Sequence, residues 1–235
     1  MATTNTHINY SPSPTTNAPN ANINISNANT KPANHPLYNI GPNRARFISL
    51  LEEYVPETFL AYLDGQDPYH PCDFYKAPAS TKYHEAYEGG LLQHSLNVYD
   101  HLTTVVNNSN NSNNNTLSYL SPSSIAKASL LHDMCKVNFY RRNLKNQKLE
   151  DGTWIRTLGW EIQDTLPLGH GEKSLAIILR CGVHLTEEEM LAIRWHMGAF
   201  EGAHVLAYPY PLQAAMKASK LVAALHLADM MAAWL

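Results

Sequence analysis

The amino-acid sequence predicts an all-α fold with one small β-hairpin insertion, and three observations support this prediction. Hydrophobic residues make up 44% of the chain, which is enough for a substantial core. From about residue 40 onward, most segments carry apolar residues at helical spacing. The segment from Phe139 to Trp160 differs, because strand-like runs flank Asp151-Gly152, a pair typical of hairpin turns.

The helices before the hairpin are placed by periodicity and by capping residues. Helical spacing over 44–63 is broken near Pro56, and the Pro- and Gly-rich stretch over 65–82 indicates a loop. A long helix is expected over 88–106, with a glycine pair at its start. Ser121-Pro122 then supplies a cap and a first-turn proline for a helix that ends at about residue 133.

Three further helices are expected after the hairpin. The first covers 171–181, and the second begins at a capping box over 186–189 and reaches His196. The last helix follows Pro209 and Pro211 and is apolar on nearly every face, which is typical of a helix buried all round.

Two polar segments interrupt this pattern. Residues 1–36 are rich in Asn, Pro, Ser and Thr, and we expect them to form a disordered tail before a domain that covers 37–235. Asn also dominates residues 107–115, which we expect to form a solvated loop insertion.

Composition favours a cytoplasmic enzyme. The net charge of −3 and the lack of a long basic run argue against tight nonspecific binding of nucleic acid. The three cysteines contain no C-x-x-C pair, which disfavours a disulfide framework or a thiolate zinc site. We see no secretory signal, and the apolar C-terminal stretch is too short to cross a bilayer, so no membrane partner is expected.

Acidic residues within apolar helices give the first sign of a functional site. Asp229 lies in such a helix, where no Lys or Arg follows Lys220, so a buried carboxylate there needs another partner or a metal ion. The adjacent pair His132-Asp133 also ends an apolar helical run. Two such acids, one beside a histidine, suggest a shared metal site.

Three more histidines stand where helices begin or end, at positions 94, 170 and 196. Imidazole and carboxylate ligands together suit a borderline or hard divalent ion. The candidate ligands are therefore His94, His132, Asp133, His170, His196 and Asp229.

In these residues the sequence resembles the HD-domain phosphohydrolase superfamily, whose pattern is a histidine, an adjacent His-Asp pair and a distant aspartate. His170 and His196 match the additional histidines of members with two metals, and Lys136 matches a lysine often found after the pair. Cys135 stands where the family more often has a small residue. The stretch over 83–94 is especially similar to the HD domains of bacterial exoribonucleases and related hydrolases.

This resemblance implies an HD-domain helical bundle that holds one or two divalent ions, which could be Mn, Fe, Co, Ni, Zn or Mg. Asp133 would bridge two ions, and Lys136 would bind a nonbridging phosphate oxygen. Further contacts to the substrate are expected from Arg141, Arg142, Lys145, His84 and Lys173, although a solvated charged hairpin explains the three hairpin residues equally well.

The leading hypothesis is a metal-dependent phosphohydrolase that cleaves a phosphoester or phosphoanhydride of a nucleotide or similar small phosphate ester. One alternative is an exonuclease that acts on single-stranded RNA or DNA, so nucleic acid stays a possible partner. Another is a non-catalytic module that senses a nucleotide. The sequence does not distinguish the substrate, the metal or the oligomeric state.

Overall fold

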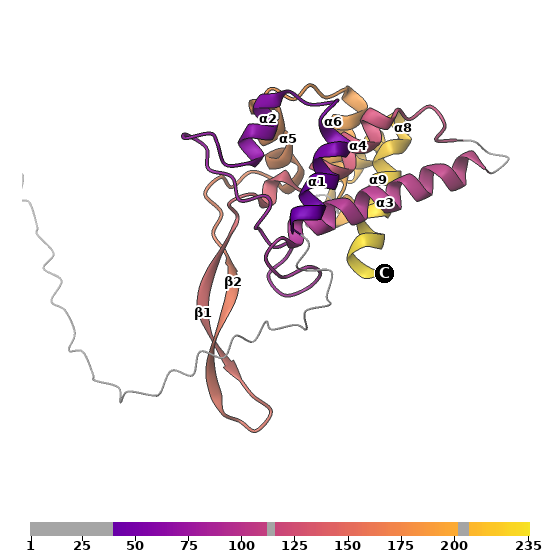
Figure 1. Ribbon diagram of the computed structural model, residues 1–235. Coiled ribbons are helices and arrows are strands. Elements are labelled where there is room, and N and C mark those ends of the chain that lie inside the picture. Colours follow the sequence, from indigo (N-terminus) through magenta and orange to yellow (C-terminus); the bar gives the residue numbers. More distant parts are fainter. Residues whose placement is uncertain (1–39, 112–115, 202–206) are drawn as a thin grey trace, which may run out of the picture.

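The computed structural model describes residues 40–111, 116–201 and 207–235 (Figure 1). The tail predicted over 1–36 lies outside these residues. The described residues form eight α-helices and one two-stranded antiparallel hairpin, which confirms the predicted fold class. Among them, no helix is both long and apolar enough to cross a membrane.

The elements follow one another in the predicted order. They are α1 (Ile40–Leu51), α2 (Glu57–Leu63), α3 (Gly90–Asn110), α4 (Pro122–Leu131), the 3-10 turn η2 (Met134–Lys136), β1 (Tyr140–Lys148), β2 (Trp154–Ile162), α5 (His170–Arg180), α6 (Glu187–Trp195), the 3-10 turn η3 (Gly198–Glu201), α8 (Tyr210–Ala218) and α9 (Lys220–Trp234).

The capping signals in the sequence begin the helices that they predicted. Ser121 accepts a hydrogen bond from the backbone N–H of Ser124 at the start of α4, and Pro122 occupies the first turn. Thr186 and Glu189 form the reciprocal capping box of α6.

Three predictions about the helices need correction. The Asn-rich segment does not begin as a loop, because α3 continues through Asn110, where helical hydrogen bonding carries on past the packed residue Val106. The single C-terminal helix is two helices, since extended backbone at Ser219 ends α8 and the Ser219 hydroxyl caps α9. Finally, α9 is not buried all round, because Leu227 and Trp234 are exposed.

The helices pack so that α3 and α6 both contact α4 and α9. A buried ion pair fixes α4 against α6: the Lys127 ammonium lies 2.8 Å from the Glu189 carboxylate and also donates to the His184 carbonyl. Ser124 donates to the other oxygen of Glu189. This network ties the N-terminal half of α4 to the first turn of α6, and each of these two helices ends at a predicted ligand.

The hairpin projects away from the helical body (Figure 1). Its register pairs Tyr140 with Ile162 at the base and Lys148 with Trp154 near the turn. The turn contains the predicted Asp151-Gly152 pair, and Gly152 adopts a positive φ of 86°.

The glycine pair before α3 allows a loop to pack closely on the first turn of the helix. Gly89 has a positive φ of 82°, and a Cβ atom on Gly90 would lie only 1.9 Å from the carbonyl oxygen of Glu85. That carbonyl also accepts hydrogen bonds from the backbone N–H groups of Ala79 and Tyr87. Gly90 therefore lets the loop that carries Glu85 approach the helix that carries His94.

We expect Gly90→Ala to lower the free energy of unfolding by about 1–3 kcal/mol, because the added methyl group forces this loop away from α3. Gly41→Ala is the matched control, since no atom of the described residues outside its own turn of helix lies within 4 Å of its Cβ position. It should be neutral or slightly stabilising. Urea denaturation of both variants measures the difference, and equal stabilities would contradict the packing described.

Candidate metal centre

The six predicted ligands come together in the interior of the helical body. His132 occupies the C-cap of α4 and is followed by Asp133, while His196 occupies the C-cap of α6. His170 is the first residue of α5, and His94 is the fifth residue of α3. Asp229 lies in the second half of α9. Their ligand atoms form overlapping groups that could hold a metal ion.

The two oxygens of Asp133 face different histidines. Oδ2 lies 3.3 Å from His132 Nε2 and 3.6 Å from His94 Nε2. Oδ1 lies 2.9 Å from His170 Nε2 and 3.5 Å from His196 Nε2. One carboxylate thus stands between two sets of imidazoles, which is the arrangement that a bridging ligand needs.

Asp229 belongs to the Oδ2 side of this cluster. Its Oδ1 atom lies 3.0 Å from His94 Nε2 and 3.7 Å from His132 Nε2. Because His94, His132 and Asp229 come from α3, the C-cap of α4 and α9, the packing of these three helices brings this half of the site together.

Backbone hydrogen bonds orient His132 and His196. Their Nδ1 atoms lie 2.7 Å from the carbonyl oxygens of Ser129 and Ile193, so each Nδ1 carries the proton and donates it. Each Nε2 is buried and has no hydrogen-bond partner within the described part of the chain. Two buried lone pairs that point into a carboxylate cluster fit a bound cation, because an unpaired buried acceptor otherwise costs stability.

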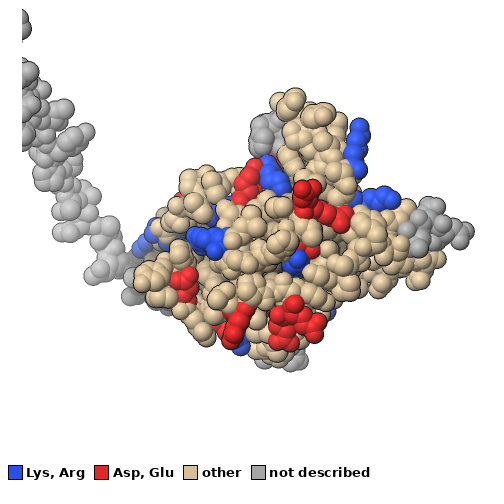
Figure 2. Space-filling view, turned by 90° about the horizontal axis from the view of Figure 1, so that it is seen from above, with Lys and Arg blue, Asp and Glu red and all other residues tan. Residues whose placement is uncertain are grey.

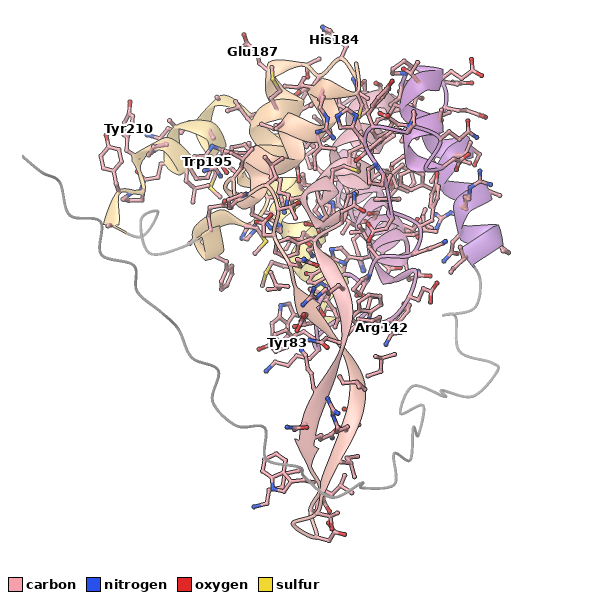
Figure 3. All side chains as sticks on the ribbon, turned by 90° about the vertical axis from the view of Figure 1, so that its left-hand side faces the viewer. Tyr83, Arg142, His184, Glu187, Trp195 and Tyr210 are labelled. Carbon is pink, nitrogen blue, oxygen red and sulfur yellow. The ribbon has the colours of Figure 1, made fainter. Side chains whose placement is uncertain are left out.

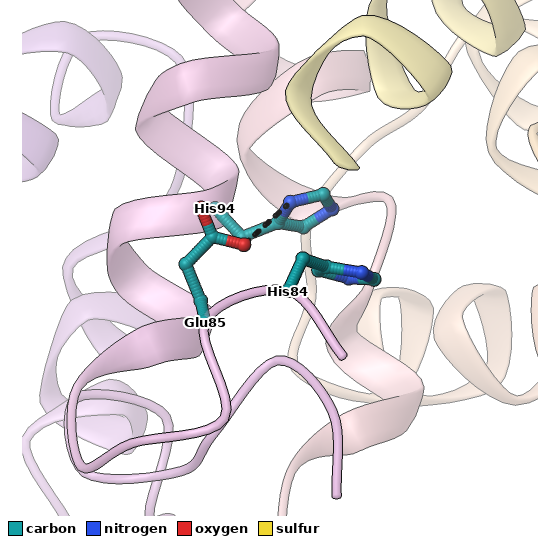
Figure 4. A group of neighbouring side chains, drawn as sticks. All are labelled: His84, Glu85 and His94. Atoms are coloured by element: carbon teal, nitrogen blue, oxygen red, sulfur yellow. Dashed lines mark ion pairs between the residues drawn. The ribbon is translucent and has the colours of Figure 1, made fainter. Parts of the chain in front are cut away.

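The Glu85 carboxylate stands behind the His94 ring at ion-pair distance, without a hydrogen bond to it. The His94 Nδ1 atom lies 3.9 Å from Glu85 Oε2 (Figure 4), whereas the other ring nitrogen, Nε2, faces Asp133 and Asp229. Glu85 is held by a chain of side-chain hydrogen bonds, since Asn97 donates to its Oε1, Gln93 donates to Asn97, and Asn43 donates to Gln93. Glu85 also adopts a positive φ of 39°, which is unusual for a residue with a side chain.

The charges at the site favour a cation. The Lys136 ammonium lies 2.7 Å from Asp133 Oδ2, while Asp133, Asp229 and Glu85 supply three carboxyl groups. Burial opposes ionisation of Asp133, but Lys136 and the neighbouring histidines hold its pKa well below the ordinary value. Burial raises the pKa of Glu85.

The histidines differ in their affinity for protons. Burial disfavours the charged form of His132 and His170, yet the neighbouring acidic groups raise the pKa of both above its usual value. Burial instead lowers the pKa of His196, and it lowers that of His84 to about 4. His196 and His84 are therefore neutral near pH 7, in the form that can bind a metal.

A cavity of about 520 Å³ opens onto this cluster. Its polar floor includes Asp133, Lys136, His170 and Asp229, and much of its wall is apolar or aromatic. Aromatic side chains around it include Tyr83, Tyr140, Phe200 and Trp234, of which all but Tyr140 are exposed. The cavity is large enough for a small organic ligand.

The predicted substrate contacts are spread over different parts of the molecule. His84 and Lys136 line the cavity. Arg141 pairs with Glu161 on the hairpin, Arg142 stacks on Trp160, and Lys145 donates to the carbonyl of Trp160. Lys173 is buried and pairs with Asp164. Arg141, Arg142, Lys145 and Lys173 are not among the described residues that line the cavity.

The structure also brings three other residues to the site. Cys135 Sγ lies 3.3 Å from His170 Nδ1 and forms a possible ligand group with Asp133 and His170. Glu85 stands behind His94, and His226 lines the cavity. The sequence signal for Cys135 and Glu85 was their position next to predicted site residues, but neither residue type fits the expected ligand pattern.

Comparisons with known protein families, curated proteins and solved structures found no match. The case for a metal site therefore depends on the chain's own geometry. Buried His, Asp and Cys groups that could hold a metal ion are present at the floor of the cavity. The thiol of Cys135 would favour a softer ion such as zinc over magnesium if it coordinates.

We expect Glu85→Gln to weaken metal binding about 10- to 100-fold, because a carboxylate behind a ligating histidine fixes its ring and raises its basicity. Glu88→Gln is the control, since Glu88 is exposed three residues away. Isothermal titration with Mn²⁺ measures the affinity, and far-UV circular dichroism checks the fold. Equal affinities for both variants would show that Glu85 does not position His94.

Metal binding should depend on pH through His132 and His170. Because their pKa values are raised, protonation of both stabilises the metal-free fold at low pH, and this contribution is lost as the pH rises through the raised values. The two aspartates have lowered pKa values and stay ionised throughout this range. The rise in melting temperature on adding Mn²⁺ should therefore grow as the pH rises from about 6.5, the ordinary pKa of histidine, through the raised values. A rise that shrinks with pH would contradict this expectation.

Proposed function

We propose that this chain is a metal-dependent phosphohydrolase of the HD-domain type, which cleaves a phosphoester or phosphoanhydride of a nucleotide or similar phosphate ester. One observation carries the proposal: Asp133 offers one carboxylate oxygen to His94 and His132 and the other to His170 and His196, at the floor of an open cavity. The ordered set of residues that resembles this superfamily is the set that converges there.

Each side chain has a defined task in this proposal. His94, His132, Asp133 and Asp229 would hold one ion, and Asp133, His170 and His196 would hold a second. A bound divalent ion supplies a water molecule of lowered pKa and polarises a phosphoryl oxygen.

Lys136 would bind and neutralise the phosphate. Its ammonium lies on Asp133 Oδ2 and lines the cavity. An ion on Asp133 would compete with this ammonium for the same oxygen, which releases Lys136 toward a phosphate oxygen. His84 is neutral near pH 7 and lines the same cavity, so it can donate a hydrogen bond to the substrate.

The walls of the cavity suit the rest of a nucleotide. Tyr83, Phe200 and Trp234 expose aromatic rings at this cavity, and aromatic rings stack on nucleobases. Burial raises the pKa of Tyr140 to about 12, so its hydroxyl stays protonated as a hydrogen-bond donor. An aromatic rim around a charged floor favours a ligand with a planar base and a phosphate group.

Metal analysis and hydrolysis assays test the proposal. The purified chain should contain one or two divalent ions and should hydrolyse bis-p-nitrophenyl phosphate or a nucleotide when Mn²⁺, Co²⁺ or Zn²⁺ is supplied. Asp133→Asn should lose bound metal and all hydrolysis above background. Because this change also leaves the buried Lys136 without its counter-ion, Asp229→Asn serves as a second variant, and it should lose at least one ion.

Asp100→Asn is the matched control, because Asp100 on α3 forms an exposed ion pair with Arg46 on α1. It should keep the metal content and the rate of the unaltered chain. If Asp133→Asn and Asp229→Asn both retain full metal content and activity, the proposed site is wrong. If both lose metal but the unaltered chain binds nucleotides without hydrolysing them, the chain is a sensing module.

A further inference from the structure

The hairpin presents two chemically different faces. Residues that pair across an antiparallel ladder point to the same face of the sheet. The observed register therefore places Arg142 beside Trp160, Lys148 beside Trp154, and Arg156 on the same face, with Tyr140 at its base. We call these six residues the aromatic–basic face.

The aromatic–basic face has an unbalanced charge. Within the hairpin, which is described in full, it carries three basic side chains and no acidic one, whereas the opposite face carries Arg141 and Lys145 with Glu161, which pairs with Arg141. Two further acids, Glu150 and Asp151, lie in the turn beyond the paired strands. This is an unusual concentration of positive charge in a chain whose net charge is −3.

One face of the helical body carries charges of both signs. Figure 2 shows Lys and Arg interspersed with Asp and Glu on the face of the molecule that is seen from above, with no continuous basic surface there. The hairpin leaves the body on another side (Figure 1). On its aromatic–basic face Arg142, Lys148, Trp154 and Arg156 are exposed, and Tyr140 and Trp160 are half-buried.

Large apolar side chains on this face are left uncovered. Trp154 is 66% exposed, and Leu158 and Ile162 on the same face are also exposed. Arg142 lies with its guanidinium carbon 4.2 Å from the centre of the Trp160 ring. Exposed aromatic surface is unfavourable in water, and a ligand that stacks on Trp154 would bury it. These side chains therefore offer a binding surface.

The face leads directly into the cavity of the metal centre. Tyr140 is the first residue of β1 and also lines the cavity. Lys136, four residues earlier in the chain, lines the same cavity. Tyr83 is 73% exposed and lines the cavity as well. Tyr83 and Arg142 lie at the level where the hairpin leaves the body (Figure 3).

We propose that the aromatic–basic face binds single-stranded nucleic acid and guides one end of the strand toward Asp133 and Lys136. This inference rests on the proposed function and names its substrate class as an oligonucleotide. Cations that neutralise phosphates, interleaved with aromatic rings that stack on bases, form the usual platform for single strands. The nine residues of each strand extend roughly 30 Å, which suits a site of a few nucleotides.

A single strand fits this face better than a duplex does. The bases of a duplex are stacked on each other and leave the exposed Trp154 ring without a partner, so a duplex would contact only the three cations. A polymer that ends in the cavity also accounts for the aromatic residues around the metal centre, because the terminal base would meet Tyr83 or Tyr140.

Fluorescence anisotropy tests the inference with a labelled single-stranded oligonucleotide of about 12 nucleotides. The full chain is measured as purified and again with EDTA, which separates binding at the hairpin from any effect of the metal site. We expect at least about tenfold weaker binding by the triple variant Arg142→Gln, Lys148→Gln, Arg156→Gln. In a plot of log affinity against log salt concentration, the slope of this variant should be smaller in magnitude by about 2.

Matched controls keep the comparison specific. Lys76→Gln, Arg180→Gln, Lys217→Gln removes the same charge from exposed positions on the helical body and should bind like the unaltered chain. Trp154→Ala should weaken binding about tenfold without changing the salt dependence. Tyr210→Ala is its control, since Tyr210 is equally exposed on α8.

Three results would overturn the inference: an unaltered chain that does not bind the oligonucleotide, equal affinities for both triple variants, or a duplex bound as tightly as the single strand. Light scattering provides a further check. If Trp154→Ala converts a dimer into a monomer and leaves the affinity unchanged, the face joins two copies of the chain instead. Because oligonucleotide binding is measured in EDTA, a failure to bind leaves the metal and hydrolysis assays as an independent test of the proposed function.

Discussion

The burial of the Asp133 carboxylate is the constraint on which the rest of the structure depends. Asp133 is 2% exposed. Moving a carboxylate out of water costs several kcal/mol unless cations or hydrogen-bond donors surround it. The described residues meet this demand with the Lys136 ammonium on one oxygen and imidazoles facing both oxygens. Histidines from four helices surround this one carboxylate. A change in how these helices pack would therefore also change the geometry of the site.

Helix ends provide much of the solution. The last carbonyl groups of a helix lack partners within the helix. At the C-caps of α4 and α6, the imidazoles of His132 and His196 donate to the carbonyls of Ser129 and Ile193. The same hydrogen bond satisfies a helix end, fixes the tautomer and directs Nε2 toward Asp133. His94 lies inside α3, and its Nδ1 faces the Glu85 carboxylate at 3.9 Å, on a loop that the glycine pair brings close.

Local patterns predicted much of this architecture, whereas contacts between distant segments were harder to predict. Helical spacing, the caps at Ser121 and Thr186, and the Asp-Gly turn placed the helices and the hairpin. The roles of Glu85 and Cys135 were not predicted, because they depend on which segments of the fold meet. The break at Ser219 and the exposure of Leu227 were missed for a related reason, since composition does not show which faces of an apolar helix have a neighbour.

Diffraction from crystals soaked in Mn²⁺, with data collected at a wavelength where manganese scatters anomalously, tests the central claim most directly. We predict an anomalous peak within coordination distance of His94, His132, Asp133 and Asp229, and a second peak on the Oδ1 side of Asp133 beside His170 and His196. With both ions bound, Lys136 should leave Asp133. Fully soaked crystals with no peak at this cluster, and with Lys136 still paired to Asp133, would contradict the metal centre described.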